Sequence, residues 1–129
     1  MNSILFFASL CLLPQPTTLT EAAGECPTNV LVSYAKDPGV GREGYRISIS
    51  RDAVRVTSGD AAGEFYANQT LSQLRAGRAA YPCVEIEDVP AYRWRGVLID
   101  DCRHFFGKET VRRVLDLMAM YKLNVLHWH

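Results

Sequence analysis

The feature that most constrains the fold is a change of hydrophobic period at Arg95. Gly96–Ile99 is a short continuous apolar run, which is typical of a strand buried on both faces. Lys108–Tyr121 carries apolar residues at helical spacing, and Asn124–His129 is a second strand candidate. Strand, helix and strand in this order predict one βαβ unit, whose two strands run parallel with a right-handed crossover.

Residues before Arg95 show a different, antiparallel pattern. Tyr45–Ser50 and Ala53–Thr57 alternate apolar and polar residues, which predicts a β-hairpin with one buried face. Asp60 is placed to cap a helix over Ala61–Leu74, and Cys83–Glu87 is another alternating strand. This part of the chain therefore predicts an α+β layer.

The first forty residues carry weaker signals. Pro14–Asn29 is rich in Pro, Thr, Gly and Ala and predicts a loop, and Val30–Tyr34 predicts a short strand. We expect two domains: an α+β domain over residues 1–90, poorly defined over 1–29, and an α/β unit over residues 91–129.

The N-terminus begins with an apolar run, Ile4–Leu13. Its length suits the core of a signal peptide, which would indicate an extracytoplasmic protein (secreted, periplasmic or lysosomal). The alternative is a buried strand that ends at the Pro14-Gln15-Pro16 breaker. Because a bilayer span needs about 20 apolar residues, we predict no membrane span.

The charge balance excludes some classes of partner. Fourteen basic residues balance fourteen acidic ones, and no long run of like charge occurs. This pattern argues against a nucleic-acid partner and favours a neutral or weakly charged substrate. The four cysteines match no paired zinc spacing, so we predict no metal site, and we interpret Cys102 as a small apolar residue at a strand end.

Polar residues follow both strands of the predicted βαβ unit. Asp100-Asp101-Cys102-Arg103-His104 comes directly after the first strand, and His127-Trp128-His129 ends the second. In parallel α/β folds, ligands bind at the carboxyl ends of the strands. The Arg103 guanidinium is suited to paired hydroxyls or a carboxylate, and Asp100 is placed to orient it. The alternative for Arg103 is a salt bridge that pins a loop.

The histidines near the end of the chain give weak evidence for a metal. We expect His127 and His129 to face opposite sides of their strand, so that only one of them points into a shared site. Either is then interpreted as a hydrogen-bonded histidine, and Trp128 as a packing residue.

Several segments resemble one enzyme family. Arg95–Phe106 (RGVLIDDCRHFF) and Asp116–His129 (DLMAMYKLNVLHWH) are very similar to the opening of the catalytic barrel in family 20 glycoside hydrolases, which include β-N-acetylhexosaminidases and chitobiases. Upstream, Glu43–Ile47, Gly63–Ala67 and Gln69–Leu74 resemble the accessory domain that precedes this barrel. The resemblance implies an α/β fold class, with an N-terminal α+β accessory domain followed by the first βαβ unit of a truncated (β/α)₈ TIM barrel.

The resemblance also implies roles for particular residues. Arg103 matches the family arginine that binds hydroxyls of the terminal N-acetylhexosamine, and Asp100 and His129 match residues near that pocket. Arg95 matches an arginine interpreted as structural. The implied partner is an N-acetylhexosamine-containing glycan, and the implied chemistry needs no cofactor and no metal.

The sequence departs from the family at the catalytic pair. The family carries an adjacent Asp-Glu in an H-x-G-G-D-E segment, and these residues contain no such segment. In the family the Glu is the general acid, and the Asp positions the substrate acetamido group whose oxygen attacks the anomeric carbon.

We therefore expect a fragment of a retaining enzyme that removes terminal non-reducing N-acetyl-D-hexosamine residues from β-linked glycans, inactive by itself. The alternative is a non-catalytic remnant that acts as a glycan- or protein-binding module. An unrelated α/β domain would require the match to be coincidental. The sequence indicates neither the preferred hexosamine and linkage nor the oligomeric state.

Overall fold

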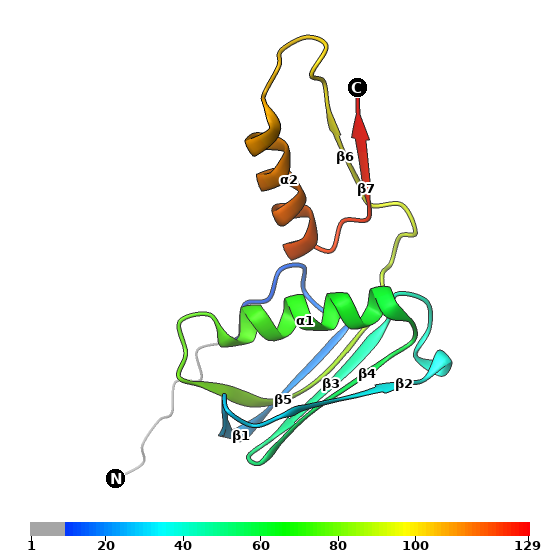
Figure 1. The fold of residues 1–129 in the computed structure, drawn as a ribbon. Helices are drawn as coiled ribbons and strands as arrows, with labels where there is room; N and C mark the ends of the chain where they lie inside the picture. The colour runs from blue at the N-terminus through cyan, green and yellow to red at the C-terminus, as the bar shows by residue number, and fades with distance from the viewer. Residues whose placement is uncertain (1–9) are drawn as a thin grey trace.

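The computed structural model describes residues 10–129, which form a mixed α/β structure. Five strands form one sheet in the order β1-β5-β3-β4-β2, and two later strands form a second sheet. Figure 1 shows helix α1 lying across one face of the first sheet, with α2 beside the second. The elements are β1 (Thr18–Pro27), β2 (Val32–Lys36), the short 3₁₀ helix η1 (Pro38–Val40), β3 (Tyr45–Ser50), β4 (Ala53–Ser58), α1 (Ala61–Arg75), β5 (Ala80–Asp88), β6 (Gly96–Ile99), α2 (Lys108–Met120) and β7 (Val125–Trp128).

The predicted hairpin is confirmed. β3 and β4 pair antiparallel, with Ile47 opposite Val56, and β5 pairs along the other edge of β3. Alternate residues of β3 are buried, and Arg46 between them is exposed. The two-residue period therefore divides the sheet into one face toward α1 and one polar face.

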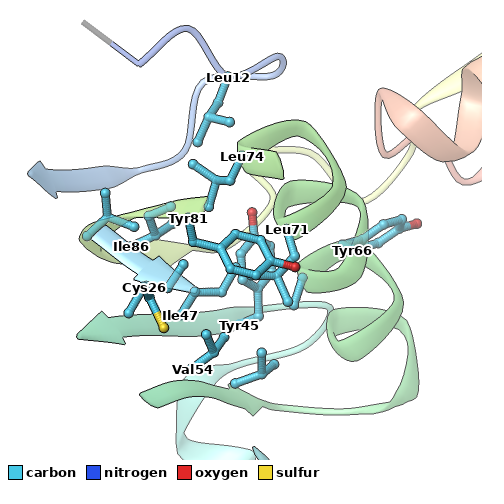
Figure 2. Packing of buried hydrophobic residues seen from close by; sticks show 14 residues of the cluster. Leu12, Cys26, Tyr45, Ile47, Val54, Tyr66, Leu71, Leu74, Tyr81 and Ile86 are labelled. Carbon is cyan, nitrogen blue, oxygen red and sulfur yellow. The ribbon is translucent and has the colours of Figure 1, made fainter. Parts of the chain in front are cut away.

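Helix α1 covers the apolar face, as its pattern predicted. Asp60 caps it by accepting a hydrogen bond from the Gly63 N–H at 2.8 Å. Leu71 and Leu74 point toward the strands and join one buried cluster with Ile47 (Figure 2). Phe65 differs from expectation, because it is half exposed on the edge of the helix.

A glycine allows the helix to sit this close. A methyl group at Gly63 would lie 2.2 Å from the Gly44 carbonyl oxygen, within overlap distance. The first turn of α1 therefore packs backbone to backbone against the loop that enters β3.

Two expectations for the N-terminal part are wrong. Most of the segment predicted as a loop is strand β1, which pairs antiparallel with β5 and has an irregularity between Glu21 and Glu25. The predicted strand Val30–Tyr34 is displaced to β2, which pairs parallel with β4. Both are edge strands with mostly exposed side chains, so the burial that creates a sequence pattern is missing.

The apolar N-terminal run falls mainly outside the described residues. Within them, Leu12 is buried in the core cluster beside the end of α1 (Figure 2). None of the helices among residues 10–129 is both long and apolar enough to cross a membrane.

The predicted βαβ unit is confirmed in its topology. β6 and β7 pair parallel, with Gly96 opposite Val125, and α2 connects them. Burial on both strand faces is not observed, since Ile99 is buried whereas Leu98 is 60% exposed. Two strands offer α2 a narrow surface, so the helix buries Val111 and Met118 and leaves Leu115 half exposed.

A buried polar contact joins the two sheets through Lys122, which follows α2. Its Nζ lies 3.0 Å from the Asp88 carboxylate and donates to the Tyr45 hydroxyl at 2.6 Å. Burial lowers the pKa of Lys122, and the charge of Asp88 opposes that shift. The lysine thus reaches from the start of β7 into the core of the five-stranded sheet.

Arg95 forms a second contact of the same kind. Its guanidinium pairs with Glu43, and its Nε donates to the Lys122 carbonyl at 2.8 Å. Both side chains of the ion pair are largely buried. The position interpreted as structural therefore lies in the contact between the two sheets, where it also orders the turn that carries Lys122.

Candidate functional site

The two parallel strands end side by side, far from the five-stranded sheet. Figure 1 shows β6 and β7 both running away from α1 toward the carboxyl end of the chain. The ladder continues past the strands, because the His129 N–H donates to Ile99 O and the Asp101 N–H donates to His129 O, each at 2.9 Å. This register places the side chains of Asp100 and His129 next to each other.

Asp100 is the centre of the predicted cluster. Its Oδ1 lies 3.2 Å from His129 Nδ1 and accepts the Arg103 backbone N–H at 3.1 Å. The hydrogen bond with His129 lowers the pKa of Asp100 below its ordinary value, and the bond from Arg103 N adds to the effect. Asp100 is therefore an ionised acceptor at neutral pH.

Arg103 projects from this cluster into solvent. Its Nε is 3.9 Å from Asp100 Oδ2, and 88% of its side chain is exposed. An exposed pair at that distance contributes little to stability. The loop is held instead by the bond from the Arg103 backbone to Asp100, which leaves the guanidinium donors free for another molecule. All three predicted site residues thus lie at one rim.

Asp101 is a site residue that the sequence reasoning did not single out. Its two carboxylate oxygens accept the Trp128 indole N–H at 2.6 Å and the Phe106 N–H at 3.1 Å. Trp128 was expected to pack in the interior, yet it is 56% exposed. Asp101 therefore ties the end of β7 to the loop that carries Arg103. The only signal was its position after the strand, which it shares with Asp100.

The expectation for the two histidines is wrong. Side chains two residues apart on a strand share a face, and the rings of His127 and His129 lie 6.4 Å apart between centroids. Both imidazoles are therefore on the same side of β7, although only His129 contacts Asp100.

Cys102 also differs from its interpretation as an apolar strand-end residue. It is exposed in the turn after β6, and it is a free thiol. Its sulfur and one ligand atom each from Asp100 and His129 all lie within 4.8 Å of one another. A carboxylate, a thiol and an imidazole thus meet here, a donor set able to hold a metal ion.

Comparisons with known proteins agree on one family. Residues 9–89 match the description "Glycosyl hydrolase family 20, domain 2", and residues 92–129 match "Glycosyl hydrolase family 20, catalytic domain". The chain is 37% identical over 119 residues to the β-N-acetylhexosaminidase of Cellulomonas fimi, covering 89% of this chain and 24% of that protein. It is 35% identical to the N,N'-diacetylchitobiase of Vibrio harveyi, covering 84% of this chain and 13% of that protein.

The fold agrees with the sequence comparison. A solved β-N-acetylhexosaminidase from Bacteroides fragilis superposes with a TM-score of 0.87 at 25% identity, covering 93% of this chain and 33% of that one. The chain thus spans about a quarter of the Cellulomonas fimi relative. Because the family descriptions match nearly the whole chain, the chain belongs to glycosyl hydrolase family 20.

Proposed function

We propose that this chain is the N-terminal part of a β-N-acetylhexosaminidase, which removes terminal non-reducing N-acetyl-D-hexosamine residues from β-linked glycans by substrate-assisted retaining hydrolysis. The observation that carries the proposal is the group of Asp100, Arg103 and His129 at the ends of two parallel strands. The printed activities of the Cellulomonas fimi and Vibrio harveyi relatives support it.

Within this proposal, Arg103 binds the sugar. Its exposed guanidinium offers parallel N–H donors that suit two neighbouring hydroxyl oxygens. Asp100 is an ionised acceptor for a further hydroxyl, and its bond to His129 holds both side chains at the rim. The three residues would bind and orient the non-reducing end, while proton transfer and acetamido positioning need groups that residues 1–129 do not contain.

We also propose the division of the chain. Residues 1–90 form the α+β accessory domain, and residues 91–129 form the opening of the (β/α)₈ barrel. The exposed apolar surface around β6 supports this assignment. An apolar hollow of about 480 Å³ is lined by β6 and α2 residues that include Leu98, Phe106 and Val114. A neighbouring barrel strand and helix would cover such a surface.

A chimera tests the activity. Residues 10–129 would replace the matching segment of the Cellulomonas fimi relative, and hydrolysis of a p-nitrophenyl N-acetylhexosaminide would be measured. We expect the chimera to be active and Arg103→Ala to lower kcat/KM by about 10²-fold, because charge-assisted hydrogen bonds contribute roughly 1.5–3 kcal/mol each. Arg112→Ala is the matched control, since Arg112 is an exposed arginine of α2 that pairs with Glu109.

The 129-residue chain alone should not hydrolyse the same substrate, because it holds no Asp-Glu pair of the family type. That absence also favours the second candidate, a non-catalytic glycan- or protein-binding module. An inactive, correctly folded chimera together with sugar binding by the isolated chain would favour the module. Equal loss in the Arg103 and Arg112 variants would refute the role of Arg103.

A further inference from the structure

We propose that Asp100, Cys102 and His129 form a binding site for a single Zn²⁺-like divalent ion at the carboxyl ends of β6 and β7. Their three ligand atoms converge within 4.8 Å. This is the one such group of three or more ligand residues found among residues 10–129. The donor set contains one carboxylate, one thiol and one imidazole, so it differs from an acidic cluster or an isolated cysteine.

The measured spacing suits tetrahedral coordination. Asp100 Oδ1 and His129 Nδ1 are 3.2 Å apart. Two ligands that each lie about 2.0–2.1 Å from a tetrahedral Zn²⁺ are separated by roughly 3.3 Å, so this pair needs almost no movement. Cys102 lies in a turn and is exposed, which lets its sulfur close the remaining distance.

The backbone holds the two strand ends in place before any ion binds. The ladder bonds between Ile99, Asp101 and His129 fix the relative positions of the ligands. The side chain of Asp101 adds a bond to Trp128 across the same two strand ends. An ion would therefore meet two ordered ligands and one adaptable thiol.

The charge around the site is compatible with a cation. Asp100 is ionised, and Arg103 is the nearest basic side chain in its ion pairs, 3.9 Å from Asp100 Oδ2. Because Arg103 is 88% exposed, its guanidinium has room to move away. Binding releases the Cys102 thiol proton to solvent, since the thiolate is the form that ligates, and the imidazole ligates as its neutral form.

Three protein ligands leave a fourth position for water or another molecule, as in open zinc sites. Asp100 and His129 are also proposed to lie near the sugar, so a bound ion would compete with the glycan for them. That consequence rests on the proposed function, whereas ion binding itself does not.

Cobalt titration of the reduced 129-residue chain tests the site without any activity measurement. We expect one Co²⁺ per chain, with the visible bands of tetrahedral cobalt and a thiolate charge-transfer band, both removed by Zn²⁺. Cys102→Ser and His129→Gln should each weaken binding by at least about tenfold, as loss of a ligand or its support typically does. Cys11→Ser is the matched control, because Cys11 is the other exposed free cysteine.

Each variant would be checked for native circular dichroism. Tetrahedral bands that persist in Cys102→Ser, or that disappear in Cys11→Ser, would place the ion elsewhere. Octahedral cobalt spectra alone, or no saturation at millimolar Co²⁺, would refute the site. None of these outcomes bears on hydrolysis by the chimera, so the two proposals fail separately.

Discussion

Replacing Lys122 with methionine tests whether the buried ion pair holds the two sheets together. Lys122→Met keeps most of the side-chain volume and removes the ammonium group that contacts Asp88 and Tyr45. Removing one partner of a buried pair typically costs about 3–5 kcal/mol, because the other charge is left without compensation. Asp88 would keep the Tyr45 hydroxyl at 2.9 Å and the Thr17 N–H at 3.2 Å. We therefore expect a loss near the lower end, about 3 kcal/mol.

Urea unfolding followed by circular dichroism measures this loss. For a slope of about 2 kcal/mol/M, the midpoint should fall by roughly 1.5 M. Lys36→Met is the matched control, because Lys36 pairs with Glu64 at 2.6 Å but is half exposed. Its loss should stay below about 1 kcal/mol.

A double-mutant cycle gives the sharper test. Asp88→Asn in the Lys122→Met background should cost less than the sum of the single changes, with a coupling of about 1–3 kcal/mol. Limited proteolysis of Lys122→Met should also accelerate within residues 91–129 more than within 10–90. Strictly additive effects, or a Lys122→Met loss no larger than that of Lys36→Met, would show that the pair does not hold the sheets together.

Three further changes probe single contacts. Gly63→Ala should lower stability by more than about 2 kcal/mol in thermal unfolding, because its methyl group would lie 2.2 Å from Gly44 O; a neutral effect would contradict the close packing, since alanine alone favours a helix by about 1 kcal/mol. Asp60→Ala should cost about 1 kcal/mol at neutral pH through loss of the helix cap. The hydrogen bond from Gly63 N lowers the pKa of Asp60, so this contribution exists above the ordinary value of 3.8 and is lost as pH falls through the folded pKa. Urea unfolding at neutral and acidic pH should show the deficit shrinking with acid, and an equal deficit at both would refute this linkage. Arg103→Ala should leave the unfolding midpoint unchanged within about 0.5 kcal/mol, because the side chain is 88% exposed; a larger shift in a thermal melt would mean that Arg103 pins the loop.

The sequence by itself determined the elements whose residues alternate between burial and solvent. The hairpin β3–β4 and the helix α1 were predicted within a residue of their observed bounds, because one face of each packs on the same core. The order of β6, α2 and β7 predicted a parallel pair, since a crossover helix between two strands has one favoured arrangement. The grouping of Asp100, Arg103 and His129 followed from that topology.

Tertiary structure alone decided the features that depend on contacts distant in sequence. β1 is an exposed edge strand whose partner β5 supplies the hydrogen bonds, so its own residues show no period. Lys122 follows a helix as a surface lysine would, yet it is buried against Tyr45, 77 residues earlier. Cys102 joins Asp100 and His129 because the turn after β6 brings its thiol back beside the end of β7. Local pattern records which face a residue presents, whereas pairing and charge burial are set by the partner that the fold brings to it.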